Sequence, residues 1–287
     1  MFFICCNFTL HLITLTAMKN SLFIVVLLLL FFFSCGKSAR KSSESVSDTV
    51  VLKEFYSNRT IKSEVSAIGE LRQGWTRNYD HEGRLISEVY YVDNVRHGPV
   101  RNYYAASGKL NSSFEYKNGI KEGDEIWYYE SGQKYRVSPF VNGKIEGIQK
   151  LYYENGNLLA EIPYKAGSPG MGLKEYKKDG TLIRDYPRLL ITKEDHLRAA
   201  NKILLFISLS DADNNVKFYK GTLVDGKYLH DKLLSLATQN GVTQLDYNIP
   251  PGAAISQKIN IVANYKTRLG NPLILSKTYD LQVLNNE

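Results

Sequence analysis

Cysteine, histidine and long apolar runs are scarce in this 287-residue sequence, and each shortage excludes a class of protein. The three cysteines stand at positions 5, 6 and 35, so the chain beyond Cys35 can form no internal disulfide and no thiolate metal site. The 36 Lys+Arg residues outnumber the 29 Asp+Glu residues but form no basic block of the kind that binds nucleic acid. We therefore expect no nucleic-acid partner and a fold that is stabilised by packing alone.

Motifs for catalysis are also missing. The five histidines make no H-E-x-x-H pair, and no G-x-S-x-G segment supplies a nucleophile elbow. "GSPGMG" at 167–172 lacks the Lys-Ser/Thr of a phosphate-binding loop and is interpreted as a loosened turn. "DADNN" at 211–215 lacks the later acidic residue of a calcium loop and is interpreted as a polar turn. The sequence predicts a protein that is not an enzyme, without catalytic residues, metal or cofactor.

The first 34 residues differ from everything after them. Leu22 to Phe33 is an unbroken apolar run of 12 residues, shorter than the ~20 that span a bilayer and typical of a secretory signal. The next residues, "FFSCGKSARKSSES", resemble the lipobox of bacterial lipoproteins, which implies cleavage before Cys35 and lipid on its sulfur and amino group. We expect a signal peptide at 1–34 whose true start is Met18, followed by the lipidated cysteine and a flexible tether at 35–50.

An uncleaved transmembrane anchor is the alternative for this segment. Either interpretation places the rest of the chain outside the cytoplasm. The predicted location is the cell envelope, on the outer membrane, with the membrane contacted through the lipid on Cys35.

Two series of glycines recur with a period of 24 or 25 residues. The first series, with Arg59 in the equivalent place of a degenerate first copy, comprises Gly83, Gly108, Gly132, Gly156 and Gly180. The second series comprises Gly74, Gly98, Gly123, Gly147 and Gly172. Two glycine series in phase indicate a repeat protein, with the repeats expected over residues 51–186.

Each copy has the pattern of a β-hairpin. An aromatic residue precedes a short turn such as "ENG", whose glycine tolerates a positive φ, and apolar and polar residues then alternate as in a strand. One hairpin cannot bury its own face, so successive copies must extend one sheet, across which recurring aromatics form ladders. Pro139 and Pro163 cannot donate to such a sheet, so we expect them at bulges or strand ends.

The phrases "YYENGNL", "NGKIEG" and "YYESGQK" resemble the variant MORN repeats of bacterial proteins of the YwqK antitoxin family. The resemblance covers residues 53–183 and implies a single-layer, twisted antiparallel sheet of consecutive hairpins. Such repeats serve binding or spacing in unrelated proteins. The family label itself implies an antitoxin-like component of a toxin–antitoxin or immunity system, which is the alternative function. That alternative conflicts with the export signal, because an exported lipoprotein cannot neutralise a cytoplasmic toxin.

The repeat period ends at Pro187, and shorter strand-like runs separated by turn residues follow. About seven strands in some 100 residues predict an immunoglobulin-like β-sandwich at 187–287. The segment 228–239, "YLHDKLLSLATQ", also fits an amphipathic helix, and this alternative stays open. The predicted fold class is therefore all-β: an extended single-layer antiparallel sheet of hairpin repeats, followed by the sandwich.

The predicted contact surface lies on repeats 2 to 4. By strand alternation Tyr129 and Tyr153 point away from their neighbours Tyr128 and Tyr152, so one tyrosine of each pair can stabilise the sheet while the other faces solvent or a partner. Trp127 shares the face of Tyr129. Basic residues complete this candidate surface: Lys134, Lys144 and Lys150.

Aromatic and basic groups dominate binding energy where a surface is used at all. The predicted function is therefore a non-enzymatic envelope lipoprotein whose repeat sheet acts as a binding or scaffold module for a protein or glycan. The competing interpretation is that the aromatic ladders only hold the sheet together.

Overall fold

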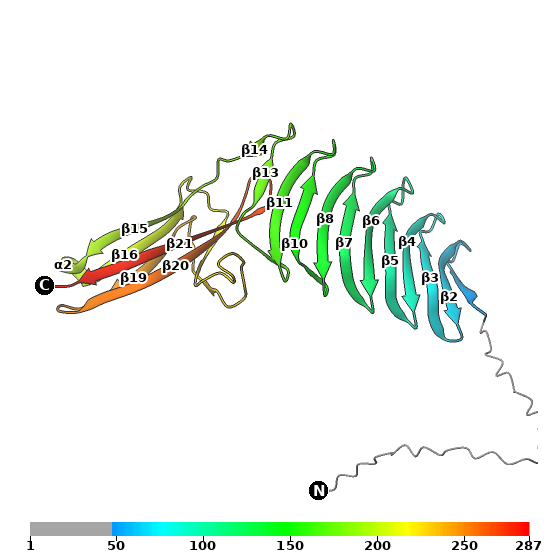
Figure 1. Ribbon diagram of the computed structural model, residues 1–287, viewed down its shortest axis with the longest axis horizontal. Helices are drawn as coiled ribbons and strands as arrows, with labels where there is room; N and C mark the ends of the chain where they lie inside the picture. Colours follow the sequence, from blue (N-terminus) through cyan, green and yellow to red (C-terminus); the bar gives the residue numbers. More distant parts are fainter. Residues whose placement is uncertain (1–47, 287) are drawn as a thin grey trace, which may run out of the picture. The chain divides into compact units, whose positions relative to one another are not determined.

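The computed structural model describes residues 48–286 and is almost entirely β-structure (Figure 1). The strands of the repeat region are β1 (Val50–Phe55), β2 (Ile61–Ile68), β3 (Leu71–Tyr79), β4 (Leu85–Val92), β5 (Val95–Tyr103), β6 (Leu110–Lys117), β7 (Ile120–Tyr128), β8 (Lys134–Val141), β9 (Lys144–Ile145), β10 (Gly147–Tyr152), β11 (Leu158–Lys165), β12 (Ser168–Pro169), β13 (Lys174–Tyr176) and β14 (Leu182–Ile183). The C-terminal elements are β15 (Leu189–His196), α2 (Leu197–Ala200), β16 (Lys202–Leu209), β17 (Val216–Lys220), β18 (Leu234–Ser235), β19 (Thr243–Asn248), β20 (Ala254–Lys266) and β21 (Pro272–Leu284).

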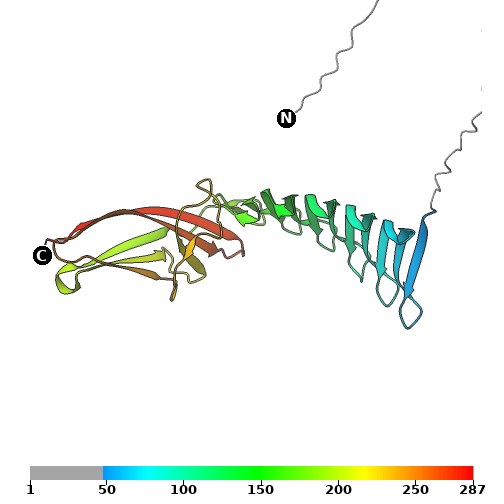
Figure 2. The same ribbon diagram turned by 90° about the horizontal axis from the view of Figure 1, so that it is seen from below.

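The repeat strands form one 14-stranded antiparallel sheet in which neighbours in sequence are neighbours in space. The short strands β9 and β12 extend the pairing of β8 and β11. Seen along the strands, the hairpins follow one another in a single layer (Figure 2). The predicted all-β repeat fold is therefore confirmed. The predicted signal peptide and Cys35 lie outside the described residues.

Backbone conformation explains both glycine series. In the hairpin turn of each copy the glycine of the first series has a positive φ, for example 86° at Gly156, and Arg59 adopts the same region at 68° in the degenerate copy. The second series lies where one strand carries extra residues. In β5, for example, the pairing Val89↔Val100 shifts to Tyr91↔Arg96 beside Gly98. A glycine at such a bulge accepts the positive φ that the chain needs there.

Pro139 and Pro163 lie opposite bulges of this kind. Opposite Pro139, the pairing of β8 passes from Val137↔Lys150 to Phe140↔Ile145, so two extra residues lie on the partner side. Pro163 lies opposite a shift of the same kind. The expectation that these prolines lie at bulges is confirmed, because the missing N–H falls where the ladder is already irregular.

The C-terminal region consists of two sheets, with strand orders β15-β16-β19 and β18-β17-β20-β21. The first, second and fifth strands thus form one sheet and the other four form the second, as in immunoglobulin-like sandwiches. The long hairpin β20–β21 lies over the smaller sheet (Figures 1 and 2).

The alternative helix at 228–239 is wrong. Leu229 N–H donates to Pro169 O and Leu236 N–H to Phe218 O, both outside the segment, and the segment contains strand β18. These bonds hold the segment across the sandwich, with Leu229 and Leu233 packed in a small apolar cluster. Tertiary packing therefore overrides the local helical pattern.

One hydrophobic core connects the last repeats to the sandwich. Ala160, Ile162 and Leu173 from the repeat sheet belong to the same buried cluster as Phe218 and Ile261 from the sandwich. The last copies are thus covered on one face by the C-terminal region, whereas the earlier copies form a layer of their own.

Candidate binding surface on the repeat sheet

The strand register assigns residues of the sheet to two faces. Directly opposite residues of antiparallel strands share a face, and chain neighbours point to opposite faces. One continuous row, which defines the core face, contains Asn78, Ser87, Asn102, Ser112, Trp127, Arg136, Leu151, Ala160 and Glu175. The row on the other side, which defines the ladder face, contains Lys53, Glu64, Arg77, Glu88, Arg101, Ser113, Ile126, Val137, Lys150, Glu161 and Lys174.

The ladder face alternates positive and negative side chains at both of its ends. Lys53 Nζ lies 2.9 Å from Glu64 Oε1, Arg77 Nε lies 2.9 Å from Glu88 Oε1, and Lys174 Nζ lies 3.5 Å from Glu161 Oε2. Each carboxylate therefore has a cation on a neighbouring strand. Charge pairs of this kind across a sheet stabilise the register modestly.

Tyrosine hydroxyls complete the ladder. Each glutamate accepts a hydrogen bond from the tyrosine fifteen residues later: Tyr79 to Glu64 at 2.8 Å, Tyr103 to Glu88 at 2.7 Å, and Tyr176 to Glu161 at 3.3 Å. The repeat thus specifies a unit of one carboxylate, one tyrosine hydroxyl and one or two cations.

The electrostatics of Glu88 show how strongly this unit holds a negative charge. Burial of the side chain acts to raise its pKa, but the hydrogen bonds from Tyr103 and Arg77 and the charges of Arg77 and Arg101 outweigh burial and lower the pKa. Burial and the same hydrogen bond raise the pKa of Tyr103 to about 12. Glu88 is therefore ionised and Tyr103 is a hydrogen-bond donor at neutral pH.

This unit is missing from the middle of the ladder face. The positions equivalent to Glu64, Glu88 and Glu161 hold Ser113 and Val137, and Ile126 stands between them where other copies have a cation. We name Ser113, Ile126 and Val137 the ladder gap. Two carboxylates and one cation that the repeat pattern supplies elsewhere are replaced by small or apolar groups.

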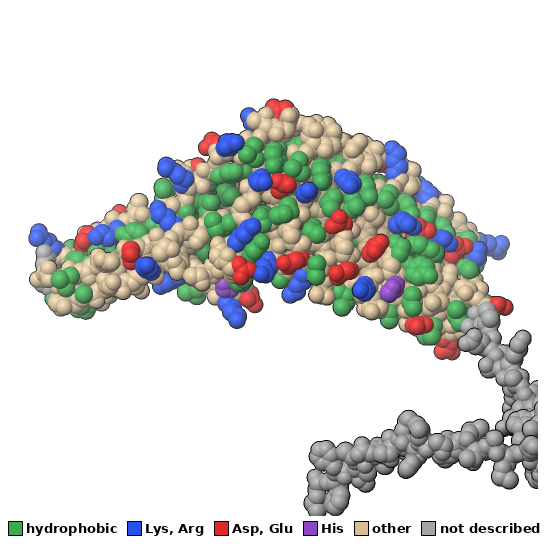
Figure 3. Space-filling model, viewed as in Figure 1, with side chains coloured by type: hydrophobic (Ala, Val, Ile, Leu, Met, Phe, Trp, Pro, Cys, Tyr) green, Lys and Arg blue, Asp and Glu red, His purple; other side chains and the backbone are tan. Residues whose placement is uncertain are grey.

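The neighbours of the ladder gap lack the contacts that their equivalents make. Among the described residues, no side-chain partner faces the hydroxyls of Tyr128 and Tyr152, and Lys150 makes no ion pair although Glu161 lies opposite it. Beside them, Ile148 is 42% exposed. Figure 3 shows hydrophobic side chains gathered over the repeat strands among groups of both charges.

The core face carries Trp127. The equivalent residues Asn78 and Asn102 donate to serine hydroxyls, each at 2.9 Å. The Trp127 ring instead lies under the guanidinium of Arg136, whose Cζ is 5.2 Å from the ring centroid. Trp127 Nε1 and Arg136 Nε are buried and have no hydrogen-bond partner among the residues described. Trp127 therefore belongs to the internal packing of this face.

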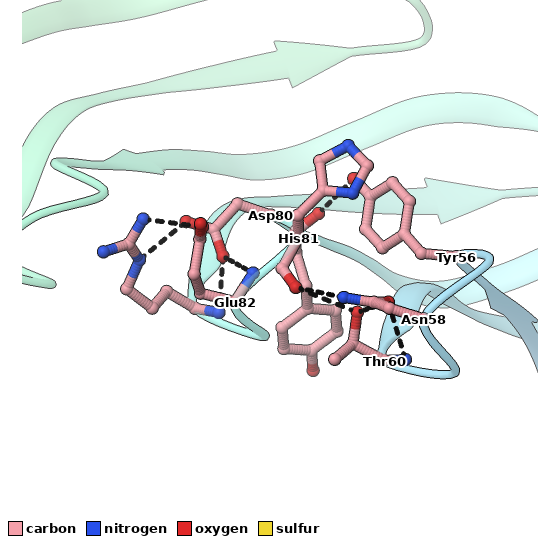
Figure 4. Close-up of polar contacts among 8 residues, drawn as sticks. Tyr56, Asn58, Thr60, Asp80, His81 and Glu82 are labelled. Atoms are coloured by element: carbon pink, nitrogen blue, oxygen red, sulfur yellow. Dashed lines mark hydrogen bonds and ion pairs between the residues drawn. The ribbon is translucent and has the colours of Figure 1, made fainter.

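The turn-side edge is held by a second set of tyrosines. Each donates its hydroxyl to a backbone carbonyl of the next copy: Tyr56 to Tyr79 O, Tyr104 to Tyr128 O, Tyr129 to Tyr152 O and Tyr153 to Tyr176 O, at 2.7–2.9 Å. Figure 4 shows the first of these contacts, where the Tyr56 ring also stacks on His81, and Asn58 and Thr60 bond the His81 carbonyl. These contacts bind each copy to the next.

The six predicted surface residues are therefore divided in space. Trp127 lies on the core face and Lys150 on the ladder face, and the exposed Lys134 and Lys144 lie at opposite ends of strands. The hydroxyls that were expected to face solvent, on Tyr129 and Tyr153, are engaged within the sheet. They serve the sheet because a tyrosine side chain is long enough to reach across one strand to the next carbonyl.

Sequence reasoning missed the ladder gap, although a signal was present. Counting five residues from each turn glycine gives Glu88, Ser113, Val137 and Glu161. Glu115 stands two positions further along its copy and does not belong to this series. Aligning the copies at that single position would have shown both the ladder and its interruption.

The other motifs make local contacts. In "DADNN", Asp213 accepts a hydrogen bond from the Tyr265 hydroxyl at 3.0 Å and from Asn215 N–H at 2.8 Å, which fits a polar turn. Within residues 48–286, no group of three His, Cys, Asp or Glu side chains is arranged to hold a metal. No helix in that range has the length and apolarity to cross a bilayer.

Comparison with known proteins identifies the type of repeat in part of the sheet. Residues 121–142 and 145–166 match the family model described as a MORN repeat variant. No curated protein matches the chain. A solved extracellular domain of a candidate one-component system from B. thetaiotaomicron is similar over 83% of this chain and 37% of its own, with 11% identity and a TM-score of 0.23. The chain thus spans little more than a third of that domain. The match of the family model places MORN-variant repeats on strands β7 to β11.

Proposed function

We propose that this protein is a non-enzymatic lipoprotein of the cell envelope whose MORN-variant sheet binds a partner protein. The lipid on Cys35 holds it to the membrane, and the segment before β1 acts as the tether. Repeats that extend one sheet by identical contacts suit a binding surface, because the scaffold is kept while single positions vary.

The ladder gap is the observation that carries this proposal. At both ends of the ladder face the repeat satisfies its own charges and hydroxyls. In the middle, Tyr128, Tyr152 and Lys150 have no side-chain hydrogen-bond or ion-pair partner among residues 48–286 and lie beside exposed apolar groups. A contiguous apolar area with unpaired polar groups at its border is typical of interaction surfaces.

A photo-cross-linking experiment in intact cells tests the binding role. The photoreactive residue benzoylphenylalanine replaces Ile148, which is 42% exposed beside the gap, or Val95, which is 45% exposed at the start of β5. We expect one defined adduct from position 148 and none of that mass from position 95. Absence of an adduct at 148, or the same adducts from both positions, would refute a binding site at the gap.

The lipid anchor is tested separately. Cys35→Ala should abolish the lipid and release the protein from membranes, because the attached acyl chains provide ~0.8 kcal/mol per buried CH₂ group. The measurements are fractionation and mobility on a denaturing gel. If the variant stayed in the membrane with unchanged mobility, the uncleaved transmembrane anchor would be the correct interpretation.

A further inference from the structure

We propose that the ladder gap binds an acidic segment of the partner protein, whose carboxylates take the places of the two glutamates that the repeat lacks there. This inference rests on the proposed binding function and specifies its chemistry. The ligand needs two carboxylates roughly 10 Å apart, since β6 and β8 are separated by two strand spacings of about 4.8 Å.

The internal comparison of the copies defines the two carboxylate positions. Wherever the repeat has glutamate, the carboxylate accepts the hydroxyl of the tyrosine fifteen residues later. By the same offset, Tyr128 serves position 113 and Tyr152 serves position 137. Both tyrosines are present, and only the acceptors are missing. A carboxylate from outside would therefore meet a hydroxyl that the sheet already presents in the position used elsewhere.

The cations of the ladder are kept at the gap as well. Arg101 lies directly opposite Ser113, and Lys150 lies directly opposite Val137. Arg101 has Glu88 on its other side at 3.7 Å, and Lys150 makes no ion pair within the part of the chain that the structure describes. Each empty position thus has one hydroxyl donor and one cation, the pair that stabilises Glu88 in the structure. Such a pair recognises a carboxylate by charge-assisted hydrogen bonds.

The surface between the two positions favours a protein over a glycan. Ile126 lies between Ser113 and Val137, with Pro139 and Ile148 further along the same face, so the centre of the gap is aliphatic. An acidic peptide can place an apolar side chain there between its two carboxylates, whereas the hydroxyls of a sugar would be left unpaired.

Acidic groups on this face limit how the peptide can lie. Glu115 stands two residues after Ser113, Asp124 stands two residues before Ile126, and both are exposed. A ligand carboxylate beside either of them would be repelled. The acidic groups of the partner are therefore directed toward the strand ends that carry Tyr128 and Tyr152.

The test restores the missing glutamates. Poly-L-glutamate of about 20 residues serves as the probe for purified protein, and polygalacturonate serves as an acidic glycan of comparable charge. We expect the wild type to bind poly-L-glutamate with an affinity that falls as salt is added. The variant Ser113→Glu/Val137→Glu should bind it at least tenfold more weakly, because its own side chains occupy both positions.

Two further variants show whether weaker binding results from occupation of the two carboxylate positions or from the added charge alone. Gln239→Glu/Ser256→Glu adds the same charge at exposed positions of the sandwich and should bind as the wild type does. Tyr128→Phe/Tyr152→Phe removes the two hydroxyls without adding charge and should also weaken binding, so the inference stays testable if the glutamate variant fails to fold.

Three results would overturn the inference: no binding of poly-L-glutamate to the wild type, unchanged binding to the glutamate variant, or tighter gap-dependent binding of polygalacturonate. The first two leave the proposed function intact if position 148 still gives its defined adduct in cells. Loss of that adduct in wild-type cells would instead refute the binding function itself.

Discussion

Removal of the charge on Glu88 is the sharpest test of the ladder. Its carboxylate accepts the Tyr103 hydroxyl at 2.7 Å and Arg77 Nε at 2.9 Å, and its side chain is 12% exposed. Hydrogen bonds to charged groups contribute roughly 1.5–3 kcal/mol, and exposed ion pairs about 0–1 kcal/mol. Glu88→Gln keeps the shape and one acceptor, so we expect the free energy of unfolding to fall by about 1–3 kcal/mol.

The effect should depend on pH in a defined direction. Because the folded-state pKa of Glu88 is lowered, its stabilisation is fully present above the unfolded pKa of about 4.3 and is lost as pH falls through the folded pKa. The difference between wild type and Glu88→Gln should therefore be largest near pH 7. It should shrink progressively below about pH 4.

The measurement is thermal unfolding at pH 7 and at pH 3, where a loss of 1–3 kcal/mol corresponds to about 2–12 °C in Tm for a chain of this size. Glu115→Gln is the matched control, since Glu115 is exposed on the neighbouring hairpin and makes no ion pair within the described part of the chain. Its unfolding free energy should change by less than about 0.5 kcal/mol. Equal effects of the two substitutions, or a Glu88 effect that persists undiminished at pH 3, would refute the ladder as a stabilising device.

Two other substitutions test how the copies couple to one another and to the sandwich. Gly156→Val forces a β-branched residue to a φ of 86°, which should lower the free energy of unfolding by more than about 1 kcal/mol. Hydrogen-exchange protection should fall only in its own and the adjacent copies, and a uniform loss of protection across the chain would contradict nearest-neighbour coupling. Glu175 is buried and accepts Thr267 Oγ1 at 2.6 Å and Asn271 Nδ2 at 2.7 Å, so Glu175→Ala should cost about 2–3 kcal/mol and expose the amides of 266–272 to exchange, whereas Glu175→Gln should cost less. Unchanged exchange at 266–272 in the alanine variant would show that this contact does not hold the junction.

The repeat architecture could be predicted because each signal is local. A turn that needs a positive φ selects glycine, and a strand with one covered face selects alternation, so the period of 24 or 25 residues is visible in the sequence. Arg59 shows that the backbone, rather than the residue, defines the position, since it adopts a φ of 68° where the other copies have glycine.

The contact between the last repeats and the sandwich, and the proposed binding surface, were not visible in this way. Ala160 and Ile162 follow the same alternation as their equivalents in other copies, yet only they are buried against the sandwich, because that contact joins segments far apart in the chain. The roles of Tyr129 and Tyr153 were missed for a related reason. Their partners are carbonyls of the next copy, and a backbone acceptor leaves no trace in the sequence.

The copies of a repeat protein can be compared with one another position by position. A position at which one copy differs from the others is therefore informative. Where the departing positions contact each other, the copy can compensate internally: Trp127 and Arg136 stand where other copies have an Asn–Ser hydrogen bond, and the ring stacks under the guanidinium. At the ladder gap, Ser113, Ile126 and Val137 depart together, while Tyr128 and Tyr152 keep the strand register of the tyrosines that bond a glutamate in other copies. If Tyr128 and Tyr152 only stabilised the ladder, their hydroxyls would have no acceptor once the glutamates are absent. Phenylalanine would then pack equally well at both positions. Tyr128 and Tyr152 lie in adjacent copies and keep their hydroxyl donors although the sheet supplies no carboxylate acceptor. This arrangement is expected if the acceptors come from another molecule.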